Sequence, residues 1–204
     1  MAGYSYYWIF APSPDGEGAD HFVQGDLKYV YDGIDIKNSF AANLLYTWKT
    51  DQSSFLNIYS PKYFNDKTKH LMLFLSPLFG GQVQDVFSAK KDSAKGFIFR
   101  PLYTLYGSIT LNKKLSPGKN PSQPQPLVTF FTSYTGRWDV INTTKYTEGY
   151  TNLLKMDADY FIITTPVKLS IGGSFNSGSD PLAGLQQQTF WLISLNVYKG
   201  IKKS

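Results

Sequence analysis

Apolar and polar residues alternate one by one in the segments of this chain that carry many of its large side chains. In YTLYGSITL (103–111), an aromatic or aliphatic residue stands at almost every second position, with Thr104, Tyr106, Ser108 and Thr110 between them. The closing run QTFWLISLNVYKGIKKS (188–204) alternates in the same way from Trp191 to Val197 and then ends in lysines. A period of two places successive side chains on opposite faces of an extended strand. We therefore expect strands with one apolar face.

Composition points to the same fold class. The chain holds 15 Tyr and 15 Phe, which suit a pleated, half-buried surface, and only two Glu against thirteen Asp. Glu is a good helix former, whereas Asp favours turns. We expect a single domain over residues 1–204 that is all-β, an antiparallel β-sandwich of jelly-roll-like form with one or two short helices.

Individual segments can be assigned along the chain. An Asp-Gly pair at 32–33 lies between two β-prone runs and predicts a hairpin over 27–38. The segment 39–48 suits a strand or a helix, 82–91 a short helix, and 142–156 a helical turn. Further strands are expected at 4–10, 55–61, 70–79, 97–115, 127–138, 159–171 and 188–198.

Two segments are expected to be exposed loops that contact other subunits. Residues 116–126 hold four prolines, and residues 172–184 are rich in Gly and Ser. Loops of uneven length favour Greek-key or jelly-roll connections between two packed sheets.

The sequence contains few residues that could form a catalytic or metal-binding site. The chain has two histidines, His21 and His70, no cysteine and no Gly-x-Ser-x-Gly turn. The acidic cluster Asp15, Glu17 and Asp20 does not have the spacing of a calcium loop. We expect no enzymatic activity, no cofactor and no metal.

Charge is distributed unevenly. Residues 1–88 carry six Lys and nine acidic residues, a net charge of −3, and residues 89–204 carry fourteen basic and six acidic residues, a net charge of +8. Basic residues interleaved with tyrosines suit single-stranded nucleic acid, although a solvated lysine surface explains the same pattern. The candidate contacts are Arg100, Lys113, Lys114, Lys119, Arg137, Lys199, Lys202 and Lys203.

Targeting signals are not evident in the sequence. No apolar run approaches the roughly 20 residues of a membrane-spanning helix. The first twenty residues lack a basic segment before an apolar one, so they do not read as a signal peptide. The expectation is a protein made without a signal peptide and with no membrane partner.

The second half of the chain resembles the jelly-roll capsid proteins of small circular single-stranded DNA viruses, the circovirus-like group, over about residues 83–201. The resemblance rests on FRPLYTLYGSITL (99–111), the polar loop 116–126, TFFTSYTGRWD (129–139), DYFIITTP (159–166) and FWLISLNVY (190–198). That family usually begins with an arginine-rich arm, whereas residues 1–20 are acidic and aromatic here, and about seventy N-terminal residues have no counterpart. The resemblance implies a structural virion protein, either a capsid or a minor shell component.

The expected function is self-assembly in a virion, with other copies or other virion proteins as partners and single-stranded nucleic acid as a further partner. Residues 1–20 would form an N-terminal arm, whose aromatic run pairs with a neighbouring subunit or covers a sheet edge. Its candidate assembly residues are Tyr4, Tyr6, Tyr7, Trp8 and Phe10. The alternative is a carbohydrate-binding sandwich, a lectin or adhesin, whose four tryptophans (Trp8, Trp48, Trp138 and Trp191) would stack on sugars.

Overall fold

Strands in a single sheet make up most of the described chain. The computed structural model describes residues 2–10, 21–32, 36–50, 58, 61–64, 69–113, 125–145, 149–164, 167–180 and 185–199. The strands are β1 (Ala2–Phe10), β2 (His21–Asp32), β3 (Lys37–Trp48), β4 (Lys62–Tyr63), β5 (Leu71–Ser88), β6 (Gly96–Asn112), β7 (Pro126–Trp138), β8 (Ile141–Asn142), β9 (Tyr150–Ile163), β10 (Val167–Asp180) and β11 (Leu185–Lys199). Pairings between these strands are antiparallel, so the all-β, antiparallel prediction is confirmed.

The strands follow one another across the sheet in chain order. The main path is β1-β2-β3-β5-β6-β7-β9-β10-β11, with β4 paired to β5 and β8 paired to β6. The expected Greek-key crossovers are not found among the described strands. The loops are uneven for another reason, because the connections from β3 to β5 and from β7 to β9 contain the short strands β4 and β8.

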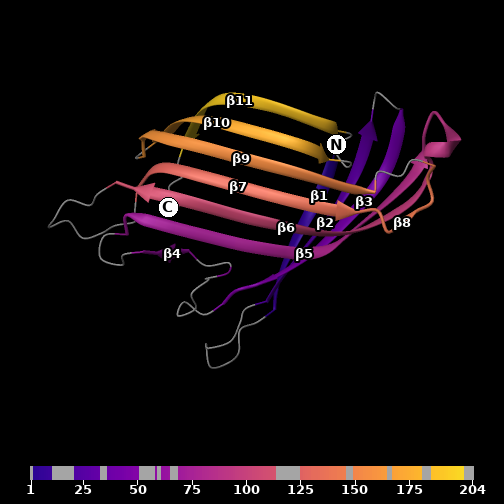
Figure 1. Cartoon of the computed structure of the whole chain (residues 1–204), viewed down its shortest axis with the longest axis horizontal. Coiled ribbons are helices and arrows are strands. Elements are labelled where there is room, and N and C mark those ends of the chain that lie inside the picture. The colour runs from indigo at the N-terminus through magenta and orange to yellow at the C-terminus, as the bar shows by residue number, and fades with distance from the viewer. Residues whose placement is uncertain are drawn as a thin grey trace.

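The sheet bends at β5 and β6 and forms two layers. The second half of β5 pairs with β3, whereas the first half of β6 pairs with β8 and its second half with β7. Gly80 and Gly81 lie at this change of partner, opposite Leu102 and Pro101. Figure 1 shows β1, β2 and β3 passing behind β6, β7 and β9 at a steep angle. The two crossing layers make the fold sandwich-like.

Most predicted strands are confirmed. The runs 4–10, 97–112, 127–138 and 188–198 lie in β1, β6, β7 and β11. The hairpin predicted around residues 32–33 is formed by β2 and β3, whose register ends with Asp32 opposite Lys37. The predictions for 55–61 and for the proline loop 116–126 fall largely outside the described residues.

The helices predicted over 82–91 and within 142–156 are wrong where the structure describes them, and of the two alternatives for 39–48 the strand is confirmed. Residues 39–48 form β3, β5 continues through Ser88, and residues 150–156 belong to β9. Pairing with neighbouring strands overrides the local preference. A three-residue 3-10 turn follows β5, in which the Lys95 Nζ lies 2.7 Å from the Asp92 carboxylate, and this hydrogen bond lowers the pKa of Asp92. The described part of the chain holds no helix long and apolar enough to cross a membrane.

The Gly- and Ser-rich segment predicted as a loop is a strand as far as Asp180. The run expected as a single strand over 159–171 is instead divided between β9 and β10. The glycines of the segment 172–184 allow neighbouring strands to lie close together, and they are not there for flexibility. A Cβ atom at Gly172 would lie 2.5 Å from the Asp159 Oδ1, and one at Gly178 would lie 2.1 Å from the Asn152 carbonyl oxygen. Gly178 also has a φ of +123°, which strains any residue with a side chain.

Candidate functional site

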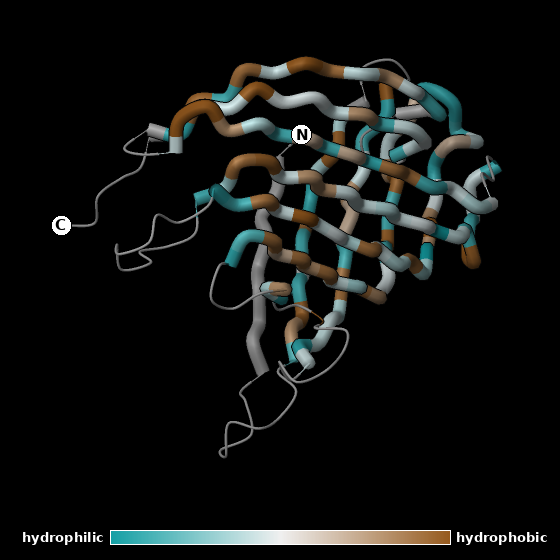
Figure 2. Tube along the Cα trace, turned by 60° about the vertical axis from the view of Figure 1, so that its left-hand side comes forward, coloured by the Kyte–Doolittle hydropathy of each residue, from teal (hydrophilic) through white to brown (hydrophobic). Residues whose placement is uncertain are grey.

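The two faces of the sheet can be followed from strand to strand because the register is nearly continuous. On one face, Tyr46 lies opposite Phe79, which lies opposite Tyr103. We call this the outer face, because its large side chains are mostly exposed, and the opposite side the inner face. Brown and teal alternate along the strands in Figure 2, as expected when the two faces differ.

The distribution of polarity is inverted relative to an ordinary water-soluble sandwich. Among the described residues, 29 large apolar side chains are exposed and only five, besides Ala41, are buried. The buried polar and charged residues are more numerous: Ser39, Thr47, Ser76, Gln82, Gln84, Arg100, Thr104, Thr110, Asn112, Ser133, Arg137, Thr151, Thr164 and Ser170. The sheet is therefore rich in polar groups inside and apolar outside.

Apolar outer-face stretches are bounded by aromatic residues. On β3, the outer face runs from Phe40 through Leu44 to Trp48, and on β9 it runs from Tyr150 to Tyr160. Aromatic side chains from neighbouring strands touch one another in a row that begins at Trp48, passes through the middle of β5 and β6 at Phe79 and Tyr103, and ends at Tyr150. Ring centroids are 6.2 Å apart for Trp48 and Phe79, 5.6 Å for Tyr103 and Trp138, and 5.1 Å for Trp138 and Tyr150. A row of aromatic rings thus crosses β3, β5, β6, β7 and β9.

Charge is almost absent from the outer face. Within β2, β3, β5, β6, β7 and β9, the outer-face positions carry one Asp, Glu, Lys or Arg, which is Asp85. The exposure is most pronounced on β11, where Ile193 is 90% exposed and Trp191 is 74% exposed. An apolar surface this continuous marks a contact with another apolar phase or partner.

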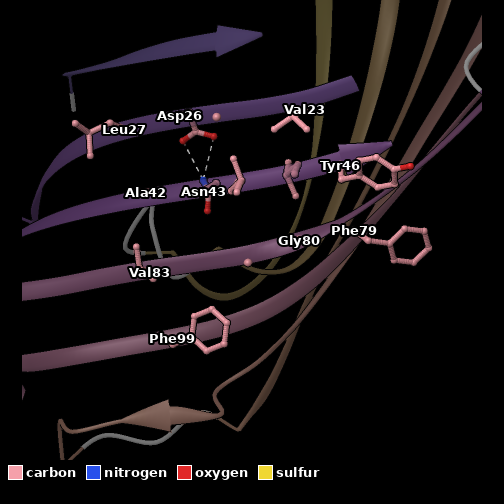
Figure 3. A pocket seen from close by; sticks show the side chains of 14 residues that line it. Val23, Asp26, Leu27, Ala42, Asn43, Tyr46, Phe79, Gly80, Val83 and Phe99 are labelled. Atoms are coloured by element: carbon pink, nitrogen blue, oxygen red, sulfur yellow. Dashed lines mark hydrogen bonds between the residues drawn. The ribbon is translucent and has the colours of Figure 1, made fainter. Parts of the chain in front are cut away.

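A hollow of about 830 Å³ lies on the outer face at the bend of the sheet (Figure 3). Gly25, Gly80 and Gly81 contribute no side chains there, and Leu44 and Phe99 are among the surrounding apolar residues. The lining includes no nucleophile and no cluster of titratable groups. The hollow therefore suits an apolar occupant rather than catalysis.

On the inner face, Arg100 of β6 is held in a buried network. Its Nε donates to the Asp139 Oδ1 at 2.5 Å, and its Nη1 donates to the Gln82 and Gln84 side-chain oxygens at 3.2 and 3.0 Å. The Arg100 and Asp139 side chains are only 4% and 3% exposed. Gln84 in turn donates to the Ser39 Oγ. This arginine is well satisfied, as a buried charge must be.

The network continues across the sheet to β2. The Gln82 Nε2 donates to the Asn43 Oδ1 at 2.7 Å, and the Asn43 Nδ2 donates to both carboxylate oxygens of Asp26 at 2.9 and 3.1 Å. Lys28 pairs with the same carboxylate at 3.2 Å. Side chains on four adjacent strands, β2, β3, β5 and β6, are therefore joined by one chain of polar contacts.

A second polar cluster lies on the inner face of β9, β10 and β11. The Asp159 Oδ1 accepts hydrogen bonds from the Ser170 Oγ at 3.2 Å and the Asn196 Nδ2 at 3.1 Å. The Asp157 Oδ1 accepts one from the Ser174 Oγ at 2.5 Å. No group of three His, Cys, Asp or Glu side chains suited to a metal occurs among the described residues. These carboxylates act as hydrogen-bond acceptors within the sheet.

Arg137, near the end of β7, is buried but poorly paired. Its Nη2 lies 3.6 Å from the Asp180 carboxylate, while its Nε and Nη1 have no hydrogen-bond partner. Thr151 lies directly opposite on β9, and its hydroxyl is likewise buried and unpartnered. Two neighbouring residues thus present unused hydrogen-bonding groups on the inner face.

The structure describes four of the eight predicted nucleic-acid contacts, Arg100, Lys113, Arg137 and Lys199. Arg100 and Arg137 are 3% and 8% exposed, so both side chains are buried here, and their contact with nucleic acid stays a prediction. Lys113 lies just beyond the end of β6, and Lys199 ends β11. The other predicted residues, Lys114, Lys119, Lys202 and Lys203, lie outside the described residues.

The predicted assembly residues lie on β1, which is one edge of the sheet. Tyr4, Tyr6, Trp8 and Phe10 occupy register positions that continue the outer face, and Tyr7 occupies an inner-face position. Their side chains are not among those described. The prediction that they mediate assembly stays a prediction.

The inner-face network escaped the sequence analysis. Gln82 and Gln84 fall in the segment predicted as a helix, yet polar residues at every second position were a signal of a strand.

Comparison with family models, with curated proteins and with solved structures finds no match for this chain. Its function is therefore inferred from the physical properties of the two faces.

Proposed function

We propose that the protein is embedded in a lipid bilayer, with its outer face against the hydrocarbon chains and its polar groups enclosed on the inner face. The observation that carries the proposal is the continuous, almost uncharged apolar outer face. Exposing a large aliphatic or aromatic side chain to water costs about 1.5–3 kcal/mol relative to burying it. Contact with hydrocarbon removes that cost for the whole face at once. The proposal departs from the expectation of no membrane partner.

The dimensions of the outer face support this location. A strand that crosses a bilayer needs about 9–11 residues. The outer-face stretches from Phe40 to Trp48 and from Tyr150 to Tyr160 span nine and eleven residues. Aromatic side chains favour the interface between hydrocarbon and headgroups, because their rings are apolar and Tyr and Trp carry a polar group. The aromatic ends of these stretches fit that position.

The backbone places one requirement on the proposal. A bilayer tolerates no unpaired backbone N–H or C=O groups facing lipid. Strands within the sheet satisfy each other, but β1 and β11 are edges, and no pairing between them occurs among the described residues. In the bilayer these edges must pair with each other or with a second copy.

Self-assembly in a virion is the second candidate, and the two strand edges favour it. Copies that pair edge to edge and pack through their outer faces would bury the same apolar surface. A lectin is less well supported, because the aromatic rings of the outer face have few polar side chains beside them to orient a sugar.

Fluorescence quenching by lipids brominated on their acyl chains separates the candidates. A variant that keeps Trp191 and has Phe in place of the other three tryptophans is refolded into phosphatidylcholine vesicles. We expect strong quenching by the brominated lipid and little by aqueous acrylamide. The matched control replaces all four tryptophans with Phe and carries Tyr106→Trp, on the inner face, where bromine should quench weakly.

The opposite pattern would overturn the lipid proposal. If Trp191 is quenched by acrylamide and not by bromine, the outer face does not meet hydrocarbon. Regular particles in the absence of lipid, seen by light scattering and negative-stain microscopy, would then favour self-assembly. A soluble monomer would contradict both candidates.

A further inference from the structure

We infer that the inner face holds a binding site for a small oxyanion, a phosphate, sulfate or carboxylate group, formed by Arg137 of β7 and Thr151 of β9. The site goes beyond the proposed function. It depends on the inner face alone, so it can be present whether the outer face meets lipid or other copies of the chain.

The first step is the unmet hydrogen-bonding capacity of Arg137. This side chain is more than nine-tenths buried, yet its Nε and Nη1 have no partner and its contact with Asp180 is long, at 3.6 Å. A close Arg–carboxylate pair has N···O distances of about 2.7–2.9 Å. A buried charge with unused donors is unfavourable, so the site gains free energy from an added acceptor.

The second step is the neighbouring hydroxyl group. Thr151 lies directly across from Arg137 in the antiparallel register and is 7% exposed, with no partner for its Oγ1. Side chains directly opposite on one face have Cβ atoms about 4.5–5.5 Å apart. An anion between them would accept hydrogen bonds from the guanidinium and from the hydroxyl.

The third step is the contrast with Arg100, the other arginine of the chain. Arg100 has Asp139 and two glutamine oxygens as acceptors, so it needs no ligand. It also acts on Arg137 as a like charge. The Asp180 carboxylate already offsets part of that repulsion from 3.6 Å, and a closer negative charge would offset more of it.

The burial of the site limits the ligand. A nucleic-acid strand needs an accessible groove that follows its backbone, and Arg137 offers none. A single oxyanion group of a few atoms is the chemical class that matches two adjacent donors. The shared chemistry of phosphate, sulfate and carboxylate can be separated by titrating each alone.

The test exploits the presence of only two arginines. The full chain is labelled with ¹⁵N-arginine and refolded in detergent micelles, which gives one Nε–Hε signal for each arginine. The Arg137→Lys variant identifies the Arg137 signal by its loss. We expect inorganic phosphate, added at constant ionic strength, to shift the Arg137 signal to saturation and to leave the Arg100 signal in place.

Variants measure what each residue contributes. Thr151→Val keeps the shape and removes the hydroxyl, and we expect it to weaken phosphate binding about tenfold. Arg137→Gln should weaken binding about a hundredfold or more. Lys155→Gln, which removes an exposed charge from β9, is the matched control and should bind as the unaltered chain does.

Three results would overturn the inference. The Arg137 signal could fail to move with phosphate, sulfate or acetate. Both arginine signals could drift together without saturating, which indicates general screening. Lys155→Gln could weaken binding as much as Thr151→Val, which indicates surface charge rather than a site. The titration of the unaltered chain decides the first two, and Arg137→Lys is needed only to say which of the two signals belongs to Arg137.

Discussion

Gly80 on β5 lies so close to Leu44 on β3 that a Cβ atom at position 80 would sit 1.9 Å from the Leu44 carbonyl oxygen. The bend of the sheet depends on this approach, because Gly80 lies where β5 changes its partners. A side chain there must push the two strands apart.

We expect Gly80→Ala to destabilise the fold by at least the roughly 1–3 kcal/mol typical of overpacking, because the obstacle is backbone and cannot rotate away. Urea unfolding followed by circular dichroism measures the change. Gly107→Ala is the control, since a Cβ atom there would lie 3.5 Å from the Thr132 Cγ2, an ordinary contact. Equal stability of the two variants would show that the bend does not need the glycine.

Breaking the buried ion pair should be costly. Asp139→Asn leaves the Arg100 guanidinium buried without its carboxylate, and we expect a loss of about 3–5 kcal/mol in the free energy of unfolding. Asp92→Asn, which breaks the exposed contact with Lys95, should leave the midpoint of unfolding almost unchanged. A double variant, Arg100→Met with Asp139→Asn, should be less damaging than the two single changes added together. Simple additivity would refute the coupling.

A charged residue introduced on the outer face tests whether that face meets lipid or water. We expect Ile193→Lys to cost about 2–4 kcal/mol for folding into vesicles if the residue meets the middle of the bilayer. Leu192→Lys, one residue away on the other face, should cost much less. The folded fraction is read from resistance to a protease added to the vesicles. No difference between the two variants would count against a lipid-facing outer surface.

Removal of residues 1–12 tests the strand edge. The deletion takes away β1 and leaves β2 as the new edge. If β1 mediates assembly, the shortened chain should keep its strand signal in circular dichroism and lose its larger species in light scattering. Normal assembly after the deletion would exclude a role for Tyr4, Tyr6, Tyr7, Trp8 and Phe10.

The sequence indicated strands well because a period of two is a local property. It predicted β6 from 103–111 and β11 from 191–197, and the Asp32-Gly33 pair predicted the hairpin of β2 and β3. The same alternation cannot say which face is enclosed. Apolar positions such as Ile109 and Ile193 point outward here, and that orientation follows from how the sheet bends rather than from any single strand.

Contacts between residues that are far apart in the sequence explain the other differences between the predictions and the structure. The segment 172–184 looks like a loop because Gly and Ser are poor strand formers. Its glycines are needed where Asp159 and Asn152 come close, and those residues precede it by more than ten positions. The unsatisfied pair Arg137 and Thr151 is likewise visible only once β7 and β9 are in register.

The chain-order arrangement of the strands has a consequence for how the protein folds. Each long strand pairs with the next long strand, so each pairing closes a short loop and the entropic cost of closure stays small. Low contact order of this kind favours growth of the sheet by successive zippering from a local hairpin. A chain cut between Asn112 and Pro126 would keep all hairpins on each side and need only the contacts of β6 with β7 and β8 to rejoin. Two fragments expressed together should therefore reconstitute the whole sheet.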